Sequence, residues 1–264
     1  SQERITDELQ KIMASPKPSV GLKLLFDTGL LKIIFPELHA LQGVKVVNKF
    51  KHKDNFYHTL QVIDNVSSVS DNIWLRWAAL LHDIGKDATK RITSNGWTFH
   101  SHEVVGGKMT QDIFKRLRLP MNNKMRYVKK MVNLHLRPIS LAKESVTDTG
   151  IRRLLFDAGE DLDDLLTLCR ADITTKNPKK VKKYIANFDK VESIMQDVQL
   201  RDEMRAFQSP VRGDEIMKIL SLSPGKKVGI IKKSIEDAIL DGKIDNNYDA
   251  ALDYMMSIKD DILT

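Results

Sequence analysis

His82 and Asp83 stand at the end of a segment, Ile73–Leu81, whose side chains are apolar on nearly every side of a helix. A helix of this kind is buried, and burying an imidazole beside a carboxylate is costly unless both groups gain a partner. A divalent metal ion would satisfy both groups at once. The pair therefore predicts metal chemistry in the interior of the protein.

Four further residues that can bind a metal occupy positions that helical spacing assigns to the core. His135, for example, ends an apolar stripe that includes Val128 and Val132. A lone histidine on an apolar face is more often a hydrogen-bonded core residue. Six such residues, the His82-Asp83 pair and four residues on separate helices, nevertheless favour a common site. The four further residues are His58, His102, His135 and Asp172.

We predict one metal site formed by four side chains: His58, His82, Asp83 and Asp172. His102 and His135 either complete that site or hold a second ion, and both alternatives stay open.

The single cysteine and two of the remaining histidines are not predicted to bind metal. Cys169 lies one turn before Asp172, and a small core residue is favoured there over a thiolate ligand. His39 and His100 are interpreted as surface or loop histidines.

The elements that must position these side chains are helices. Helical periodicity runs through nearly every long segment and predicts an all-α fold, with one hairpin expected around Asn95-Gly96. Asn177 and Pro178 are expected to begin a long helix, and two shorter helices are expected near residues 213–220 and 227–240. We expect a helical neck at residues 1–45, a domain that holds the site at 46–175, and a helical tail at 176–264.

Composition narrows the class of protein. The net charge of +7 favours a polyanionic partner such as RNA. With a single cysteine, Cys169, an internal disulfide is excluded and a reducing compartment is expected. No apolar stretch reaches the roughly 20 residues that span a bilayer, and the polar N-terminus lacks a secretory signal. We therefore expect a cytoplasmic protein without a membrane partner.

The order of the candidate ligands resembles a known family. His58, then His82-Asp83, then Asp172 is similar to the HD superfamily of metal-dependent phosphohydrolases, and His102 and His135 fit its variants with extra histidines. The resemblance implies an HD-domain helical bundle. It also implies one or two divalent ions (Mn, Mg, Ni, Co or Fe) whose bound water attacks a phosphate ester.

A narrower resemblance covers almost the whole chain. Gly29-Leu30-Leu31 and Pro36-Glu37-Leu38 are similar to the neck of bacterial tRNA nucleotidyltransferases (CCA-adding enzymes) and related poly(A) polymerases. Pro224-Gly225 and Gly242-Lys243 are similar to the tail of that family. The family's nucleotide-adding head has no counterpart in this sequence. We therefore expect this chain not to polymerise nucleotides, although its parent protein is expected to do so.

The resemblance implies tRNA or other RNA 3′ ends and nucleotide phosphates as partners. Asp83 and Lys86 are the candidate catalytic residues; Asp83 would orient the attacking water, and Lys86 is either a contact to the substrate phosphate or a solvated lysine. Lys226 and Lys227 at the start of a predicted helix are candidate RNA contacts. Two alternatives stay open: a non-catalytic RNA-binding body, and a free-standing HD nucleotidase or phosphodiesterase.

Overall fold

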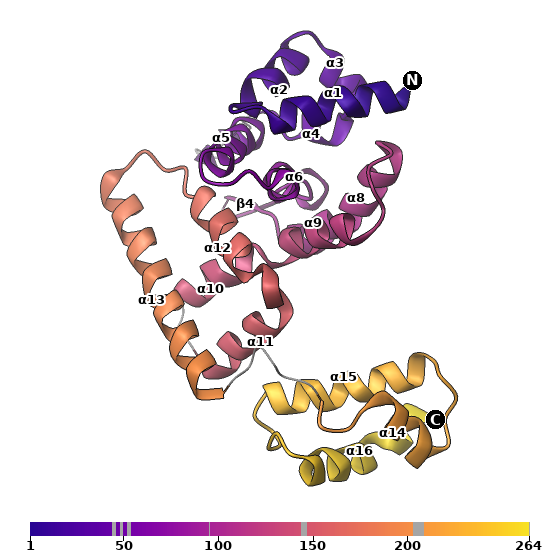
Figure 1. Cartoon of the computed structure of the whole chain (residues 1–264). Coiled ribbons are helices and arrows are strands. Elements are labelled where there is room, and N and C mark those ends of the chain that lie inside the picture. Colours follow the sequence, from indigo (N-terminus) through magenta and orange to yellow (C-terminus); the bar gives the residue numbers. More distant parts are fainter. Residues whose placement is uncertain are drawn as a thin grey trace. The chain divides into compact units, whose positions relative to one another are not determined.

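The computed structural model describes residues 1–43, 46–47, 50–51, 54–94, 96–143, 147–202 and 209–263. Helices dominate this part of the chain, and strands occur in it only as two antiparallel pairs (Figure 1). The predicted all-α fold is therefore confirmed. None of the described helices is long and apolar enough to cross a membrane.

The elements follow one another in this order: α1 (Gln2–Ala14), α2 (Pro18–Asp27), α3 (Leu30–Ile34), α4 (Pro36–Ala40), β1 (Val46–Val47), β2 (Phe50–Lys51), α5 (Asn55–Ser67), α6 (Ile73–Leu81), α7 (Lys86–Thr89), β3 (Arg91–Thr93), β4 (Gly96–Thr98), α8 (His102–Arg116), α9 (Asn123–Leu134), α10 (Leu136–Lys143), α11 (Asp148–Ala158), a 3-10 turn (Gly159–Asp161), α12 (Leu162–Ala171), α13 (Pro178–Asp202), α14 (Gly213–Leu220), α15 (Lys226–Leu240) and α16 (Tyr248–Leu263).

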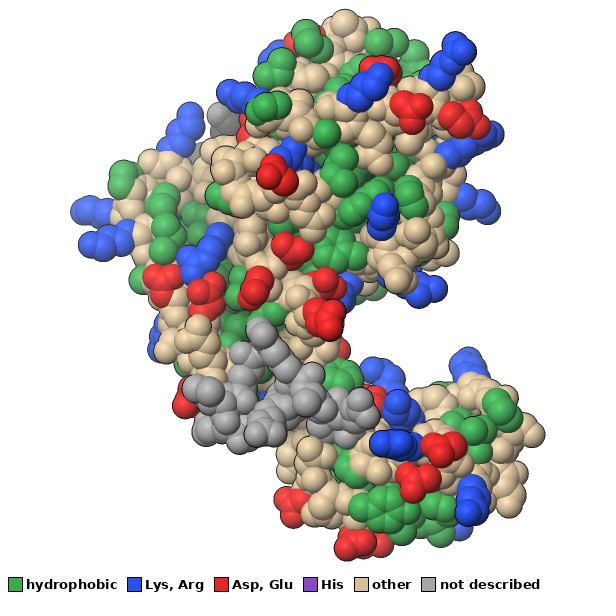
Figure 2. Space-filling view, viewed as in Figure 1, with side chains coloured by type: hydrophobic (Ala, Val, Ile, Leu, Met, Phe, Trp, Pro, Cys, Tyr) green, Lys and Arg blue, Asp and Glu red, His purple; other side chains and the backbone are tan. Residues whose placement is uncertain are grey.

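The chain divides into two compact units. The first combines Ser1–Glu144 with Glu160–Lys190, and the second combines Ser145–Gly159 with Val191–Thr264. On the face shown in Figure 2, basic side chains are interspersed with acidic ones on both units. The domain boundaries expected at residues 45 and 175 stay a prediction.

The centre of the first unit is α6, which packs against α5, α9 and α12. Its apolar side chains from Leu75 to Leu81 are buried, so the end of this helix lies in the interior. Arg76 is also buried, and its guanidinium donates hydrogen bonds to the carbonyls of Met13 and Ser15. These bonds satisfy the buried charge and attach the end of α1 to α6.

A three-residue polar network fixes the start of α6. Asn72 caps the helix by accepting a hydrogen bond from the backbone of Trp74, and its amide donates to the hydroxyl of Tyr127 and to Asp164. The Tyr127 hydroxyl donates to Asp164 at 2.6 Å. Burial and the Asp164 carboxylate raise the pKa of Tyr127 above its ordinary value.

We expect Tyr127→Phe to lower the free energy of unfolding by about 1–2 kcal/mol, because it removes a hydrogen bond to a charged group at a half-buried position. Urea denaturation measures this loss. Tyr248→Phe is the matched control, since Tyr248 is 42% exposed and has no such partner among the described residues. Equal stability of the two variants would contradict the assigned role of the network.

The elements expected around the site are present, with one correction. Strands β3 and β4 pair as a hairpin, but Gly96, which was expected in the turn, lies in β4 opposite Thr93, and Asn95 lies outside the described residues. Asn177 caps α13 by accepting from the backbone of Lys179 and Lys180. The tail prediction was incomplete, because α16 follows the two expected helices α14 and α15. Ala251 and Met255 of α16 are buried and complete an apolar core with residues such as Ile231 and Ile235 of α15.

Candidate metal centre

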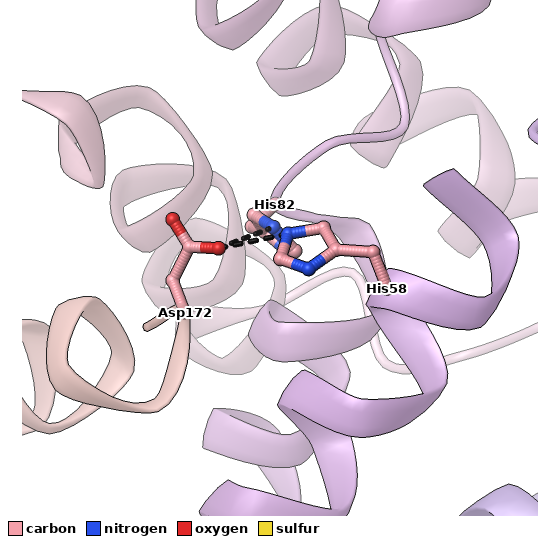
Figure 3. A group of neighbouring side chains, drawn as sticks. All are labelled: His58, His82 and Asp172. Carbon is pink, nitrogen blue, oxygen red and sulfur yellow. Dashed lines mark ion pairs between the residues drawn. The ribbon is translucent and has the colours of Figure 1, made fainter. Parts of the chain in front are cut away.

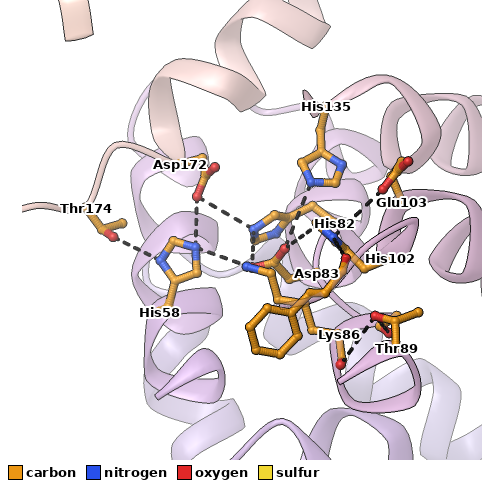
Figure 4. Close-up of polar contacts among 12 residues, drawn as sticks. His58, His82, Asp83, Lys86, Thr89, His102, Glu103, His135, Asp172 and Thr174 are labelled. Carbon is orange, nitrogen blue, oxygen red and sulfur yellow. Dashed lines mark hydrogen bonds and ion pairs between the residues drawn. The ribbon is translucent and has the colours of Figure 1, made fainter. Parts of the chain in front are cut away.

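The six predicted metal-binding residues converge in the first unit (Figure 4). Three of them directly follow a helix: His82 follows α6, His135 follows α9 and Asp172 follows α12. The other three lie within α5, just after His82, and at the start of α8: His58, Asp83 and His102. Five helices therefore deliver polar side chains to one point in an otherwise apolar interior.

Helix packing explains why these residues are buried. The α6 helix is enclosed by its neighbours, so its end delivers His82 and Asp83 with only 1% and 2% of their surfaces exposed. His135 is 2% exposed, because α9 packs against both α6 and α8.

The ligand atoms form two groups. The first contains His58, His82 and Asp172 (Figure 3), in which the Asp172 Oδ1 atom lies 2.8 Å from His58 Nε2 and 3.7 Å from His82 Nε2. The second contains Asp83, His102 and His135, in which Asp83 Oδ1 lies 3.3 Å from His102 Nε2 and 3.9 Å from His135 Nε2. Within each group the ligand atoms lie within 4.8 Å of one another.

The carboxylate of Asp83 faces both groups. While its Oδ1 atom faces the second group, its Oδ2 atom lies 3.3 Å from His82 Nε2 and 3.6 Å from His58 Nε2. From the sequence, Asp83 was expected in the first group, and the place of His102 and His135 stayed open. In the structure, Asp83 lies between the groups, an arrangement in which one carboxylate can serve two ions.

Three histidines are oriented by the same local device. The Nδ1 atoms of His82, His102 and His135 lie 2.7–2.8 Å from the carbonyl oxygen three residues earlier in the chain. Because a carbonyl can only accept, each Nδ1 carries a hydrogen, so that any of these rings in its neutral form presents the lone pair of Nε2. These three Nε2 atoms are buried and have no hydrogen-bond partner among the described residues.

The charges of the centre favour a bound cation. Burial raises the pKa of Asp83, but His82, Lys86 and His102 lower it more, so it lies well below the ordinary value. Burial opposes ionisation of Asp172 in the same way, yet His58 and His82 lower its pKa to about 2. Both carboxylates are thus ionised at neutral pH.

The imidazoles of the centre differ in their affinity for protons. Burial and the nearby His82 lower the pKa of His135 to about 4, and burial lowers the pKa of His58. Burial also opposes the protonation of His82, but Asp83 and Asp172 outweigh it and raise its pKa. A cation entering the centre would compete with that proton.

This donor set of imidazoles and carboxylates fits a divalent transition-metal ion. The fit rests on the three buried Nε2 atoms described above, since an unsatisfied polar atom in the interior is costly. A cation would satisfy them and balance the two carboxylates.

Lys86 lies beside the centre. Its Nζ atom is 2.5 Å from Asp83 Oδ2, and its side chain is only 20% exposed. This geometry differs from that of a solvated lysine. The contact brings a fixed positive charge next to the carboxylate that faces both ligand groups.

Thr174 is a site residue that the sequence analysis missed. Its hydroxyl lies 2.9 Å from His58 Nδ1, and both side chains are buried. No motif signals this contact, because the two residues are 116 positions apart and meet only through the packing of α12 near α5.

The remaining candidates are placed as follows. Cys169 is a buried core residue whose thiol donates to the His135 carbonyl, and burial raises its pKa well above the ordinary value. His100 is exposed, as expected. The interpretation of His39 was incomplete, because it lies half-buried in α4 and stacks on Phe26. Lys226 and Lys227 are exposed residues of the second unit.

Two family models match the chain. The model described as "HD domain" matches residues 55–177, a range that contains all six residues of the centre. The model described as "Probable RNA and SrmB- binding site of polymerase A" matches residues 1–42. These matches agree with the order of ligands and with the neck pattern in the sequence.

Several relatives are similar over much of the chain. An A-adding tRNA nucleotidyltransferase of Deinococcus radiodurans is 31% identical over 248 residues, which are 92% of this chain and 55% of the relative. A CC-adding tRNA nucleotidyltransferase of Thermus thermophilus is 27% identical over 95% of this chain and 55% of the relative. A multifunctional CCA protein of Vibrio parahaemolyticus is 33% identical over 64% of this chain and 42% of the relative.

The chain thus spans about half the length of the relatives that it matches. Both family models and the relatives agree with the resemblance that the sequence carries. The chain therefore contains an HD domain and a neck segment that matches the polymerase A model, and it is similar over more than nine tenths of its length to tRNA nucleotidyltransferases.

Proposed function

We propose that this HD domain is a divalent-metal-dependent phosphoester hydrolase, within a protein that processes or repairs the 3′ ends of tRNA. The observation that carries this proposal is the set of three buried Nε2 atoms around the ionised carboxylate of Asp83. Buried polar atoms that serve only the structure are normally hydrogen-bonded, whereas these Nε2 atoms have no hydrogen-bond partner among the described residues. The names of the relatives support tRNA as the partner of the whole protein.

The residues of the centre would bind two cations. His58, His82 and Asp172 would hold one cation, and His102 and His135 would hold a second, with Asp83 shared between them. When bound, such a cation activates water and neutralises charge on the phosphoryl oxygens.

The other contacts keep these groups in place. The carbonyls of Ala79, Phe99 and Val132 fix three of the imidazole rings. Lys86 balances the charge of Asp83, and its ammonium group is positioned to attract an anionic substrate.

Metal-dependent hydrolysis is the direct test. The chain is treated with a chelator and assayed with 2′,3′-cyclic AMP and p-nitrophenyl phosphate, before and after adding Mn, Ni, Co, Fe or Mg. We expect no turnover without metal and at least about a 100-fold increase with the preferred ion. Elemental analysis that finds bound metal without any turnover would favour the alternative, a non-catalytic RNA-binding body.

We further propose that the tail contacts RNA through Lys226 and Lys227. Both are exposed in the first turn of α15, where backbone N–H groups also favour phosphate. Replacing both by glutamate is expected to weaken tRNA binding about tenfold at low salt. The slope of log K against log salt should become shallower by roughly 2.

Filter binding at several salt concentrations measures both effects. The control variant replaces Lys232 and Lys233 by glutamate, which changes the net charge equally on the same helix. If the two variants bind tRNA equally well, net charge explains the effect and the proposed contact is wrong.

A further inference from the structure

A cavity of about 620 Å³ lies directly beside the first ligand group, in the first unit. His58 and Asp172 form part of its wall, so a molecule bound in the cavity would touch the metal centre. Its volume is within the range of sites for ligands of the size of one nucleotide. The other residues that matter here are Ile139, Ile173, Lys176, Tyr184, Asn187 and Phe188.

Apolar and aromatic side chains form another part of the cavity wall. Phe188 is buried, and Arg170 lies 5.9 Å from the centre of its ring. Tyr184, one turn earlier on α13, is 39% exposed and also lines the cavity. Ile139 and Ile173 add aliphatic surface. Such a wall suits a planar, weakly polar group.

Besides His58 and Asp172, the polar residues that line the cavity are Gln61, Thr174, Thr175, Lys176 and Asn187. The amide of Asn187 is half-buried and has no hydrogen-bond partner among the described residues. An amide offers one acceptor and two donors, which is the pattern needed to bind the edge of a nucleobase. Lys176 is exposed and adds a positive charge at the edge of the same cavity.

We infer that this cavity binds the nucleoside part of a nucleoside phosphate, with the base stacked on Tyr184 and its edge bonded to Asn187. The inference rests on the proposed function, because the phosphate would then lie at the metal centre. It makes Tyr184 and Asn187 the residues that determine specificity. The nucleoside phosphate is either a free nucleotide or the terminal nucleotide of an RNA.

Equilibrium binding tests the inference independently of turnover. Adenosine 2′-phosphate and inorganic phosphate are titrated into the manganese-loaded full chain by calorimetry. We expect Tyr184→Ala to weaken binding of the nucleotide by about tenfold or more, since stacking on an aromatic ring is lost. Binding of inorganic phosphate should stay unchanged. Tyr248→Ala, which truncates a similarly exposed tyrosine in the second unit, should change neither affinity.

Two further variants test the Tyr184 ring and the Asn187 amide separately, and one further ligand tests the source of the nucleotide. Tyr184→Phe should retain nucleotide affinity, because the ring is kept, and Asn187→Ala should reduce it. A trinucleotide that ends in a 2′-phosphate distinguishes the sources: tighter binding than adenosine 2′-phosphate identifies an RNA end, and equal binding identifies a free nucleotide.

The inference is overturned if the wild-type chain binds adenosine 2′-phosphate no more tightly than inorganic phosphate, or if Tyr184→Ala leaves their ratio unchanged. Its failure can be told apart from that of the proposed function. Equal hydrolysis of glycerol 2-phosphate and 2′,3′-cyclic AMP, with no effect of Tyr184→Ala, would keep the hydrolase and reject the nucleoside site. Selective nucleotide binding without any hydrolysis would keep the nucleoside site and reject the hydrolase.

Discussion

Replacing Asp83 by asparagine is expected to abolish metal-dependent hydrolysis and to lower metal affinity by more than about 100-fold. Changes to groups that merely support a metal ligand already cost 10–100-fold, and Asp83 faces both ligand groups directly. The substitution keeps the shape of the side chain but removes the charge that offsets the cation and the Lys86 ammonium. Elemental analysis and the hydrolysis assay measure the two effects.

The control for this prediction is Asp87→Asn. Asp87 is an exposed carboxylate in α7, only four residues further along the chain, and its replacement changes the net charge equally. Full metal content and activity in the Asp83 variant would mean that the carboxylate is a structural partner of the histidines. Loss of activity in both variants would point to an effect of overall charge.

Helical spacing predicted that the six candidate side chains face the interior, and the structure brings them together; their role as metal ligands stays a prediction. Each of the six lies on the inward face or at the buried end of a helix, and an ionisable side chain in such a position needs a partner. His135 after Val132 illustrates this, because both residues are buried as the period of α9 requires. The all-α fold followed from the same periodicity.

The way in which the residues divide into two groups could not be predicted from spacing. The two oxygens of Asp83 face different histidines because α5, α8 and α9 approach from different sides. Nothing in the sequence fixes those approach angles. The contact of Thr174 with His58 and the cavity beside Tyr184 depend on the same packing, so neither could be predicted from the sequence.

The α16 helix was missed for a local reason. Only two of its residues, Ala251 and Met255, are buried, and they lie four positions apart; acidic residues interrupt the pattern between and beyond them. The side chain of Asn247 accepts a hydrogen bond from the backbone of Ala250. This cap was the available signal for the start of the helix.

Gly85→Ala is expected to destabilise the protein by about 3 kcal/mol and to disturb the second ligand group. A Cβ atom at this position would lie 2.2 Å from the carbonyl oxygen of His102 and 2.7 Å from the backbone nitrogen of Gly106. Both obstacles are backbone atoms of the first turns of α8, so the helix itself must move. The movement would carry His102 away from Asp83. Urea denaturation and metal titration should therefore change together, with metal affinity falling about tenfold.

Gly107→Ala provides the matched control, because its Cβ would meet an even closer atom, the side-chain Oδ1 of Asn133 at 2.0 Å. That amide can rotate away, and alanine favours the helix by up to about 1 kcal/mol over glycine. We therefore expect a change of less than about 1 kcal/mol and unaltered metal affinity. The nature of the obstructing atom, more than its distance, decides the cost. Equal losses in both variants would contradict this argument, and an unaffected Gly85 variant would mean that α8 can shift without moving His102 out of the centre.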